Sequence, residues 1–375
     1  MMRLVLVLFG LCVCLGAAWA DNPAKPAGQP KEPGKTTLED VWSKVSVKLG
    51  ALVRLGALFE DPEGQVDDNY YFRVDNVFLL IKGTYGKDLG FFVQPHYSNY
   101  LPGGGTMNGA DMWVEYRRFP VKIRLGKTQY PGSFGAFQPT GKLDFITRPA
   151  MCTETALPQL RDIGLLLHGD LFSREMELPV VGKRQMTVTL YGMISNGKQP
   201  RAGSMGEGMM YTGRADLTVK GLMKFGVCYL KDYQSHELGE IKVNGVANPV
   251  DSLRYAACDL TVYVDDFRVG GEVIHGRIED AGSAPWYFEG AYAVAFYKFY
   301  KGKEFAAEAG VRYQLWDRNT DDGYEAETLT CGVNIFFNPK KPHSAKLQVN
   351  YRRMTDDDPA KPDKNALDVL MQLCF

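Results

Sequence analysis

The chain has 375 residues, and its 43 Lys and Arg residues nearly balance 44 Asp and Glu residues, which leaves a formal net charge of -1 with His neutral. A near-neutral chain lacks the extended basic face that general nucleic-acid binding requires, so nucleic acid is excluded as a partner. The seven cysteines include no Cys-x-x-Cys motif and no Cys/His pair. The sequence therefore predicts neither a metal site nor a cofactor.

The first residues, MMRLVLVLFGLCVCLGAAWA, carry Arg3, then an apolar run, then the small-residue pattern AWA. This pattern predicts a secretory signal peptide, residues 1–20, that is cleaved before Asp21. The alternative is an uncleaved membrane anchor, but the apolar run is short for a spanning helix. Residues 21–43 begin with a Pro-, Gly- and Lys-rich segment that cannot bury apolar surface, which predicts a flexible periplasmic leader.

Two of the cysteines, Cys12 and Cys14, lie within the predicted signal peptide. The other five are widely spaced, and we expect them to pack as small apolar thiols. One disulfide stays open as an alternative, because an oxidising envelope permits it. These five are Cys152, Cys228, Cys258, Cys331 and Cys374.

From residue 44 onward the helical period disappears, and apolar residues recur at every second position. This is the period of a strand with one apolar face. Following it along the chain predicts sixteen strands. They span residues 44–60, 69–82, 88–98, 110–118, 121–130, 161–172, 184–194, 209–218, 222–232, 253–264, 267–276, 286–299, 303–316, 327–337, 343–354 and 365–375.

Most of these predicted strands have one apolar and one polar face. In the strand at 303–316, Val311 and Tyr313 have one parity, while Arg312 and Gln314 have the other. Such alternation suits a wall with lipid on one side and water on the other.

Two stretches depart from this pattern. In the strand at 69–82, Val77 and Leu79 fall on the face that Arg73 assigns to water. One inserted residue reverses the parity of a strand, so we predict a β-bulge there. The connection at 173–183 is long for a turn, and the sequence offers no reason for its length.

The predicted connections alternate between long polar loops and short turns. The segments at 131–160 and 233–252 are long, whereas those at 219–221 and 265–266 are short. Outer-membrane barrels keep short turns on the periplasmic side and long loops outside, and a soluble β-sandwich has no reason to do so. The alternative is a soluble all-β protein with an aromatic core.

The chain ends with LDVLMQLCF, an apolar strand pattern that finishes on Phe375. In hydrocarbon every backbone donor and acceptor must be paired, so strands can span a membrane only as a closed ring. We therefore expect the strand at 365–375 to pair with the strand at 44–60. The sequence predicts an all-β fold at 44–375, a transmembrane antiparallel β-barrel of about 16 strands in the bacterial outer membrane.

Residues 110–170 hold three pieces that together carry a family resemblance. They are RLGKTQYP at 124–131, FITR at 145–148 and RDIGLLLHG at 161–169. In this block the chain resembles the phosphate-selective porin family (the O and P porins), in which an irregular loop joins two such strands. The resemblance implies a sixteen-stranded trimeric channel whose third outer loop folds inward as a constriction loop.

The residues of the segment at 131–160 support an inward position independently. The segment is far longer than a hairpin needs, is rich in Gly and Pro, and contains Phe134, Phe137 and Phe145. Exposing these rings to water costs free energy, whereas packing them against the inner wall buries them. An inward loop would narrow the pore.

Cations at such a narrowing would attract anions, because a low-dielectric wall strengthens the field of fixed charges. Arginine suits phosphate through its planar fork of donors. The alternative is that these cations are neutralised by carboxylates such as Asp144, Glu154 and Asp162. The candidate pore-lining and anion-binding residues are Arg124, Lys127, Lys142, Arg148, Arg161, Arg73 and Arg54, with Arg214, Arg268 and Arg352 as an extension.

These features predict a porin for passive diffusion of small hydrophilic solutes, with a preference for anions such as phosphate. A non-selective pore is the main alternative. A barrel enzyme is less favoured, because the five histidines are scattered and no G-x-S-x-G motif is present. A loop-dominated adhesin is neither supported nor excluded.

The expected partners follow from the expected location. They are outer-membrane lipid and lipopolysaccharide, small anions, and the two further copies of a homotrimer that the family resemblance implies. The acidic runs at 67–68 and 356–358 would bridge lipopolysaccharide through divalent cations, or else are solvated loop tips.

Overall fold

The computed structural model describes residues 43–62, 69–101, 104–152, 161–178, 182–197, 209–233, 240–243, 246–280, 285–321, 323–359 and 361–375. The predicted signal peptide and all but the last residue of the predicted leader lie outside these ranges. Within the described ranges, no helix is long and apolar enough to cross a membrane.

Sixteen strands form the wall of a barrel, and one further short strand forms a small hairpin with one of them. The wall strands are β1 (Val45–Pro62), β2 (Asn69–Tyr85), β3 (Leu89–Leu101), β4 (Gly104–Tyr116), β5 (Lys122–Gln129), β6 (Arg161–Leu178), β7 (Gly182–Ser195), β8 (Met210–Val219), β9 (Met223–Tyr233), β11 (Val246–Val264), β12 (Phe267–Asp280), β13 (Trp286–Lys301), β14 (Ala306–Asp317), β15 (Glu325–Phe336), β16 (Ala345–Asp356) and β17 (Lys364–Cys374). The short β10 (Glu240–Val243) pairs with β11.

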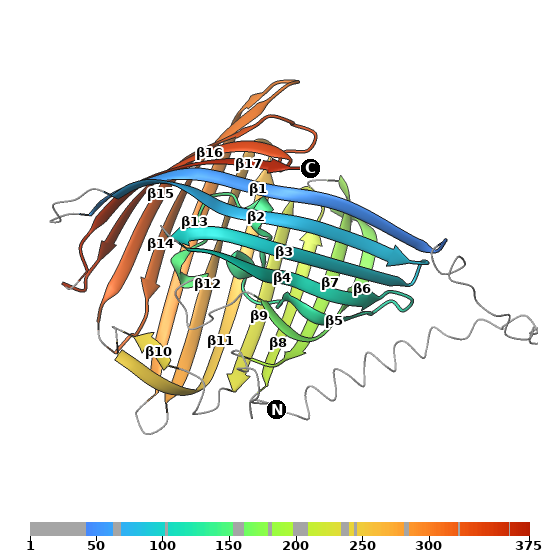
Figure 1. Cartoon of the computed structure of the whole chain (residues 1–375), viewed down its shortest axis with the longest axis horizontal. Coiled ribbons are helices and arrows are strands. Elements are labelled where there is room, and N and C mark those ends of the chain that lie inside the picture. Colours follow the sequence, from blue (N-terminus) through green and yellow to red (C-terminus); the bar gives the residue numbers. More distant parts are fainter. Residues whose placement is uncertain are drawn as a thin grey trace, which may run out of the picture.

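Every wall strand pairs with an antiparallel neighbour on both sides. The ring closes where β17 pairs with β1, from Leu52 opposite Cys374 to Pro62 opposite Lys364. Figure 1 shows these first and last strands, blue and red, side by side. The predicted all-β barrel of about 16 strands, closed by its terminal strand, is confirmed.

Side chains alternate between the two faces of the wall as predicted. On β14, Val311 and Tyr313 point outward and are 40% and 43% exposed, whereas Arg312 and Gln314 point inward and are 4% and 3% exposed. The outer face is therefore an apolar surface with no protein covering it in the single chain. A protein in water rarely leaves so much apolar surface uncovered, but lipid would cover it.

The inner face is less polar than the strand pattern predicts. Leu230, Leu253, Tyr255 and Phe288, on β9, β11 and β13, are at most 1% exposed. They are buried because a loop packs against them inside the barrel and shares their apolar cluster. The loop residues in this cluster are Tyr130, Ala136, Met151 and Cys152.

The predicted bulge in the second strand is confirmed. Arg54 lies opposite Asn76 and Leu55 lies opposite Val74, so Asp75 is the inserted residue. The insertion turns Val74 and Val77 to the same outer face and leaves Asp75 inside, where its carboxylate lies 2.9 Å from Arg54 Nη1.

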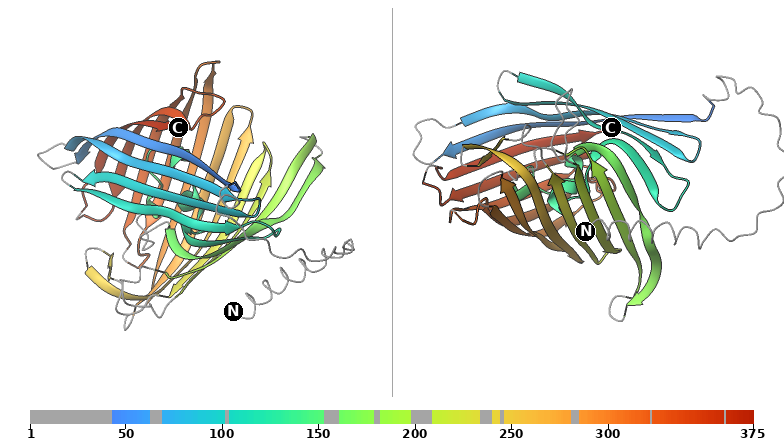
Figure 2. Two further views of the ribbon diagram at one scale, coloured as in Figure 1. Left: turned by 45° about the vertical axis from the view of Figure 1, so that its right-hand side comes forward. Right: turned by 90° about the horizontal axis from the view of Figure 1, so that it is seen from below.

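The length of the connection at 173–183 now has a structural explanation. β6 and β7 continue to Leu178 and Gly182, but β5 pairs with β6 only as far as His168, and β8 pairs with β7 only from Met186. The two strands thus extend past their neighbours as a two-stranded ribbon (Figure 2).

The five cysteines outside the predicted signal peptide are all free thiols. Cys152 and Cys228 are buried, as expected for thiols packed as small apolar groups, whereas Cys258 and Cys374 are partly exposed and Cys331 is exposed. The alternative of a disulfide among these five is not supported.

Candidate functional site: the inner loop and its arginine pocket

The segment between β5 and β6 folds into the barrel, and we call its described part, residues 130–152, the inner loop. It contains the short helix α3 (Phe134–Phe137), with Ser133 Oγ accepting a hydrogen bond from Ala136 N, and the 3₁₀ turns η1 (Thr140–Lys142) and η2 (Ala150–Cys152). A Cβ on Gly135 would lie 2.6 Å from Cys152 Sγ, so glycine permits the two ends of the loop to pack together.

One end of the inner loop is fixed to β8 and β12. Arg214 donates from Nη1 to Gly132 O at 3.0 Å. Glu272, which is 2% exposed, accepts hydrogen bonds from Phe134 N at 2.7 Å and Gly135 N at 3.0 Å. A carboxylate thus satisfies two backbone donors at the start of α3 that the helix itself leaves unpaired.

The middle of the loop is fixed to β16 and β17, next to the barrel seam. Lys346 Nζ donates to Leu143 O at 2.8 Å, and Gln372 Nε2 donates to Gly141 O at 3.0 Å. Ile146 donates its N–H to Asn350 Oδ1 at 2.7 Å. These bonds hold the loop against the inner wall, so the predicted inward folding is confirmed.

Replacing Glu272 with glutamine is expected to loosen the start of α3. Glutamine keeps one acceptor oxygen, and its amide group cannot accept from a backbone N–H, so one buried donor loses its partner at a cost of about 1–3 kcal/mol. Hydrogen exchange measured by mass spectrometry should then be about tenfold faster at residues 134–137. The matched control is Glu327→Gln on the exposed outer face of β15, and equal exchange in both variants would refute a tethering role for Glu272.

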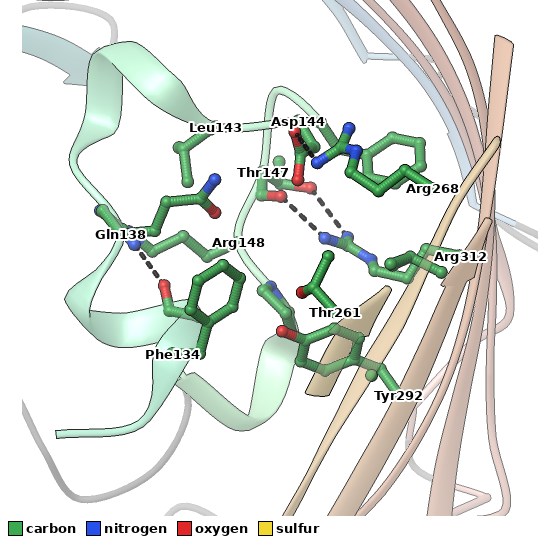
Figure 3. A pocket seen from close by; sticks show the side chains of 15 residues that line it. Phe134, Gln138, Leu143, Asp144, Thr147, Arg148, Thr261, Arg268, Tyr292 and Arg312 are labelled. Atoms are coloured by element: carbon green, nitrogen blue, oxygen red, sulfur yellow. Dashed lines mark hydrogen bonds and ion pairs between the residues drawn. The ribbon is translucent and has the colours of Figure 1, made fainter. Parts of the chain in front are cut away.

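A pocket lies between the inner loop and the wall strands β11 to β14 (Figure 3). Three of its lining side chains are guanidinium groups, from Arg148, Arg268 and Arg312, and one is a carboxylate, from Asp144. The rest of the lining is Phe134, Gly135, Gln138, Leu143, Phe145, Thr147, Pro149, Thr261, Gly271, Tyr292 and Val294. We call this the arginine pocket.

The arginines of the pocket differ in their partners. Arg268 forms an ion pair of 2.7 Å with Asp144. Arg312 donates to Thr147 O at 3.0 Å, and Arg148 donates to Gln138 O at 2.6 Å as well as to the carbonyl of Gly135. In the described part of the chain, the bonding partners of Arg148 and Arg312 are carbonyl and hydroxyl oxygens, so their charges are not neutralised by carboxylates.

Arg148 carries its charge at neutral pH in spite of its surroundings. Burial lowers the pKa of its guanidinium to about 10, and the nearby charges of Arg161 and Arg54 act in the same direction. A pKa of about 10 still leaves the group protonated at pH 7. The lining of the pocket therefore carries a net positive charge.

Two of the predicted site residues lie at the barrel seam and contact the loop or its supports. Arg54 is 2% exposed and donates from Nη2 to Ile146 O at 3.1 Å. Arg73 is 7% exposed and lies 3.1 Å from the carboxylate of Asp368. Both side chains are too deeply buried to touch a passing solute. These two residues therefore support the structure behind the loop.

A third predicted residue, Arg124, lies on the inner wall at β5. Arg124 stacks over the Trp113 ring at 4.1 Å and lies 2.6 Å from Glu115 Oε2. The same carboxylate accepts from Arg117 at 2.7 Å and lies 3.0 Å from His168 Nε2. This network occupies a different part of the inner wall from the pocket.

Three more of the predicted residues lie at separate places. Arg148 lies in the arginine pocket, as described above. Arg161, at the start of β6, lies 3.1 Å from Asp111 Oδ2. Lys142 is an exposed residue at the end of η1.

Lys127 is on the outer face of the wall rather than in the lumen. It lies opposite Met112 on β4 and Ile163 on β6, which are outward-facing and 45% and 52% exposed. Its neighbour Thr128 points inward and accepts a hydrogen bond from Arg124. Because side chains alternate between the two faces of a strand, Lys127 points away from the pore.

The alternative, in which Asp144, Glu154 and Asp162 neutralise the loop cations, differs from the pairs in the structure. Asp144 pairs with Arg268 instead of Lys142. Asp162 accepts the backbone N–H groups of Ile163 and Gly197, both at 2.7 Å. Glu154 lies outside the described residues.

Sequence reasoning missed three side chains that organise this site. Arg312 and Lys346 were visible only as inward-parity residues of their strands, and Glu272 had no distinguishing signal. Their roles depend on the path of the loop, which brings residues 204 positions apart together, as in the bond from Gln348 to Asp144 O.

No protein-family model matches the chain, and no curated protein matches it in sequence. Solved structures do match its fold. An anion-selective porin from Comamonas acidovorans aligns with a TM-score of 0.64 and 13% identity, over 88% of this chain and 100% of that one. The trimer form of OmpT, an outer membrane protein of Vibrio cholerae, gives 0.59 and 11% over 88% and 99%. The outer membrane channel DcaP of Acinetobacter baumannii gives 0.56 and 12% over 89% and 98%. At these identities the likeness establishes a shared barrel fold.

Proposed function

We propose that the chain is an outer-membrane porin that lets small hydrophilic solutes diffuse passively, with a preference for anions. The observation that carries the anion preference is the arginine pocket, where three guanidinium groups face one carboxylate beside the inward loop. The proposed role is passive and includes no catalytic step. The solute gradient supplies the driving force.

The pocket has the chemistry that an anion-selective passage needs. An anion that leaves bulk water requires donors and positive charge. Arg148, which is partly exposed, supplies both from a fixed position, and Arg312, which is 4% exposed, adds its positive charge. Their guanidinium forks suit an oxyanion such as phosphate, which agrees with the resemblance to phosphate-selective porins. Because several of their donors already bond to loop carbonyls, binding would be weak enough to permit exit.

The same proposal covers location and assembly. The short turns between β8 and β9 and between β11 and β12 would face the periplasm, and the loop-bearing end would face outward. Export would depend on the signal peptide at residues 1–20. A homotrimer is proposed because one of the similar barrels is described as a trimer form and because the family resemblance implies it.

Planar lipid bilayers provide the test of this function. The full chain should insert with stepwise conductance, and its reversal potential in a salt gradient should have the sign of anion selectivity. Adding phosphate should reduce the chloride current if the arginine pocket binds it. A cation-selective reversal potential would overturn the anion preference, and the absence of conductance steps would overturn the porin assignment.

A further inference from the structure

Three cations stand side by side on the outer face of the barrel near its loop-bearing end. Lys231 on β9 lies directly opposite Arg254 on β11, and Arg254 lies directly opposite Arg277 on β12. All three have the parity of the exposed outer residues Val227, Leu260 and Val273. We call these three side chains the cationic row. Figure 1 shows the three strands that carry it adjacent in the wall.

Aromatic rings flank the cationic row at both ends. Tyr211 lies opposite Lys231, and Tyr287 lies opposite Arg277. The Lys231 ammonium lies 4.1 Å from the ring centre of Tyr233, and the Arg277 guanidinium lies 5.8 Å from that of Tyr287. Tyrosines that face outward beside cations are typical of the level where a membrane meets water.

The charges of the cationic row are only partly compensated. Like charges directly opposite each other on neighbouring strands are destabilising. Glu279 Oε1 lies 3.2 Å from Arg254 and 3.3 Å from Arg277, so one carboxylate is shared between two guanidinium groups. The side chains of Arg254 and Arg277 remain 37% and 30% exposed, and thus accessible to an external anion.

The height of the cationic row matches the boundary of a lipid bilayer. On the outer face of β11, Ala256, Cys258, Leu260 and Val262 follow Arg254 before Val264, which lies opposite Phe267 near the turn. At about 3.4 Å per residue and a tilt of about 40°, this stretch rises about 26 Å. An outer-membrane barrel has an apolar band of about 25 Å between two aromatic girdles, so the row lies just beyond that band.

The neighbouring sector of the outer face has the opposite charge. Glu289 on β13 lies opposite Asp317 on β14, only two positions along from Tyr287. The acidic loop residues are engaged within the chain, since Asp356 lies 2.8 Å from Arg318 and Asp358 lies 3.4 Å from Lys361. Residues 67–68 lie outside the described ranges. Among the described residues of β9, β11, β12 and β13, the lipid-facing positive charge near the loop-bearing end is thus localised at the cationic row.

We propose that the cationic row binds the phosphate groups of phosphorylated lipid headgroups in the outer leaflet. An anionic headgroup would relieve the repulsion among the three cations, while acyl chains would lie along the apolar outer faces of β9, β11 and β12. The orientation of the row toward the outer leaflet rests on the proposed function. The lipid contact itself requires only that this face meets a membrane.

The test uses the full chain in detergent, titrated with diphosphoryl lipid A and monitored by native mass spectrometry. The variant Lys231→Gln/Arg254→Gln/Arg277→Gln should bind this lipid at least about tenfold more weakly than the wild type. The matched control Arg174→Gln/Lys183→Gln/Arg184→Gln removes the same charge from the exposed ribbon of β6 and β7 and should bind as the wild type does. Glu279→Gln removes the shared carboxylate and should bind more tightly.

Other outcomes of this test would overturn either the lipid proposal or the porin assignment. Equal loss in the row variant and the ribbon variant would overturn the proposal, as would equal binding of dephosphorylated lipid A to the wild type. Displacement of lipid A by inorganic phosphate alone would assign the row to free phosphate and overturn the lipid assignment. If lipid A binds as predicted but the wild type gives no conductance steps, the porin assignment fails and the lipid site stands.

Discussion

Replacing Asp368 with alanine is expected to lower the free energy of unfolding of the barrel by about 3–5 kcal/mol. Asp368 is fully buried on β17, and its carboxylate lies 3.1 Å from Arg73 on β2 and 2.8 Å from Arg352 on β16. The pairs therefore span the seam where the last strands meet the first. Without the carboxylate, Arg352 loses its 2.8 Å ion pair, and the buried Arg73 loses its shorter ion pair while keeping the one of 3.7 Å with Asp75.

Urea unfolding of the refolded chain in detergent measures this effect. Asp321→Ala, in an exposed loop, is the control and should change the unfolding free energy by no more than about 0.5 kcal/mol. Asp368→Asn keeps the shape of the side chain, and its unfolding free energy should lie between those of Asp368→Ala and Asp321→Ala. Equal midpoints for Asp368→Ala and Asp321→Ala would show that the seam does not depend on this carboxylate.

The double substitution Arg148→Gln/Arg312→Gln is expected to give the largest change in ion selectivity. Two unit charges about 8 Å from a permeating anion in water contribute about 0.5 kcal/mol each. Their removal should therefore reduce anion permeation by about fivefold. The reversal potential in a salt gradient, measured on single channels, reports the change.

Two further variants distinguish an effect of charge on selectivity from an effect of altered structure. Arg148→Lys/Arg312→Lys keeps both charges and should retain most of the anion preference, even where the bonds to Thr147 and Gln138 change. Lys183→Gln/Arg184→Gln on the ribbon removes two charges outside the lumen and should leave the reversal potential unchanged. An unchanged reversal potential in Arg148→Gln/Arg312→Gln would mean that these arginines only support the loop.

The wall of the barrel could be predicted from the sequence because apolar and polar residues alternate with a two-residue period within each strand. Even the bulge at Asp75 could be predicted in this way, because the parity change between Arg73 and Val77 revealed an inserted residue. The extended ribbon could not be foreseen in the same way. Its exposed residues, such as Arg174 and Glu175, carry no apolar face that would mark them as strand.

The site was less predictable, because it depends on where one loop lies inside the barrel. The bonds from Glu272 to α3 and from Arg312 to Thr147 join residues more than 130 positions apart. Strand parity placed Arg312 in the lumen but did not indicate its partner. Lys127 illustrates a different limit, since its position in a family-like motif suggested the pore while its parity with Leu125 places it on the outer face.

A single cysteine substitution tests the closed wall most directly. Leu52 on β1 lies opposite the native Cys374 on β17, and the flanking pair Ala51 and Phe375 exchanges both backbone hydrogen bonds. Leu52 and Cys374 are therefore a non-hydrogen-bonded pair, in which the Cα atoms lie about 4.5 Å apart, within the range of a disulfide.

Leu52→Cys in the membrane-assembled protein should form a disulfide with Cys374 on mild oxidation, detected by mass spectrometry as a peptide joining the two ends of the barrel. Leu58→Cys, which lies opposite Asp368, should form none. Failure of Leu52→Cys to link to Cys374, or linkage of Cys374 to Leu58→Cys instead, would contradict a wall closed in this register.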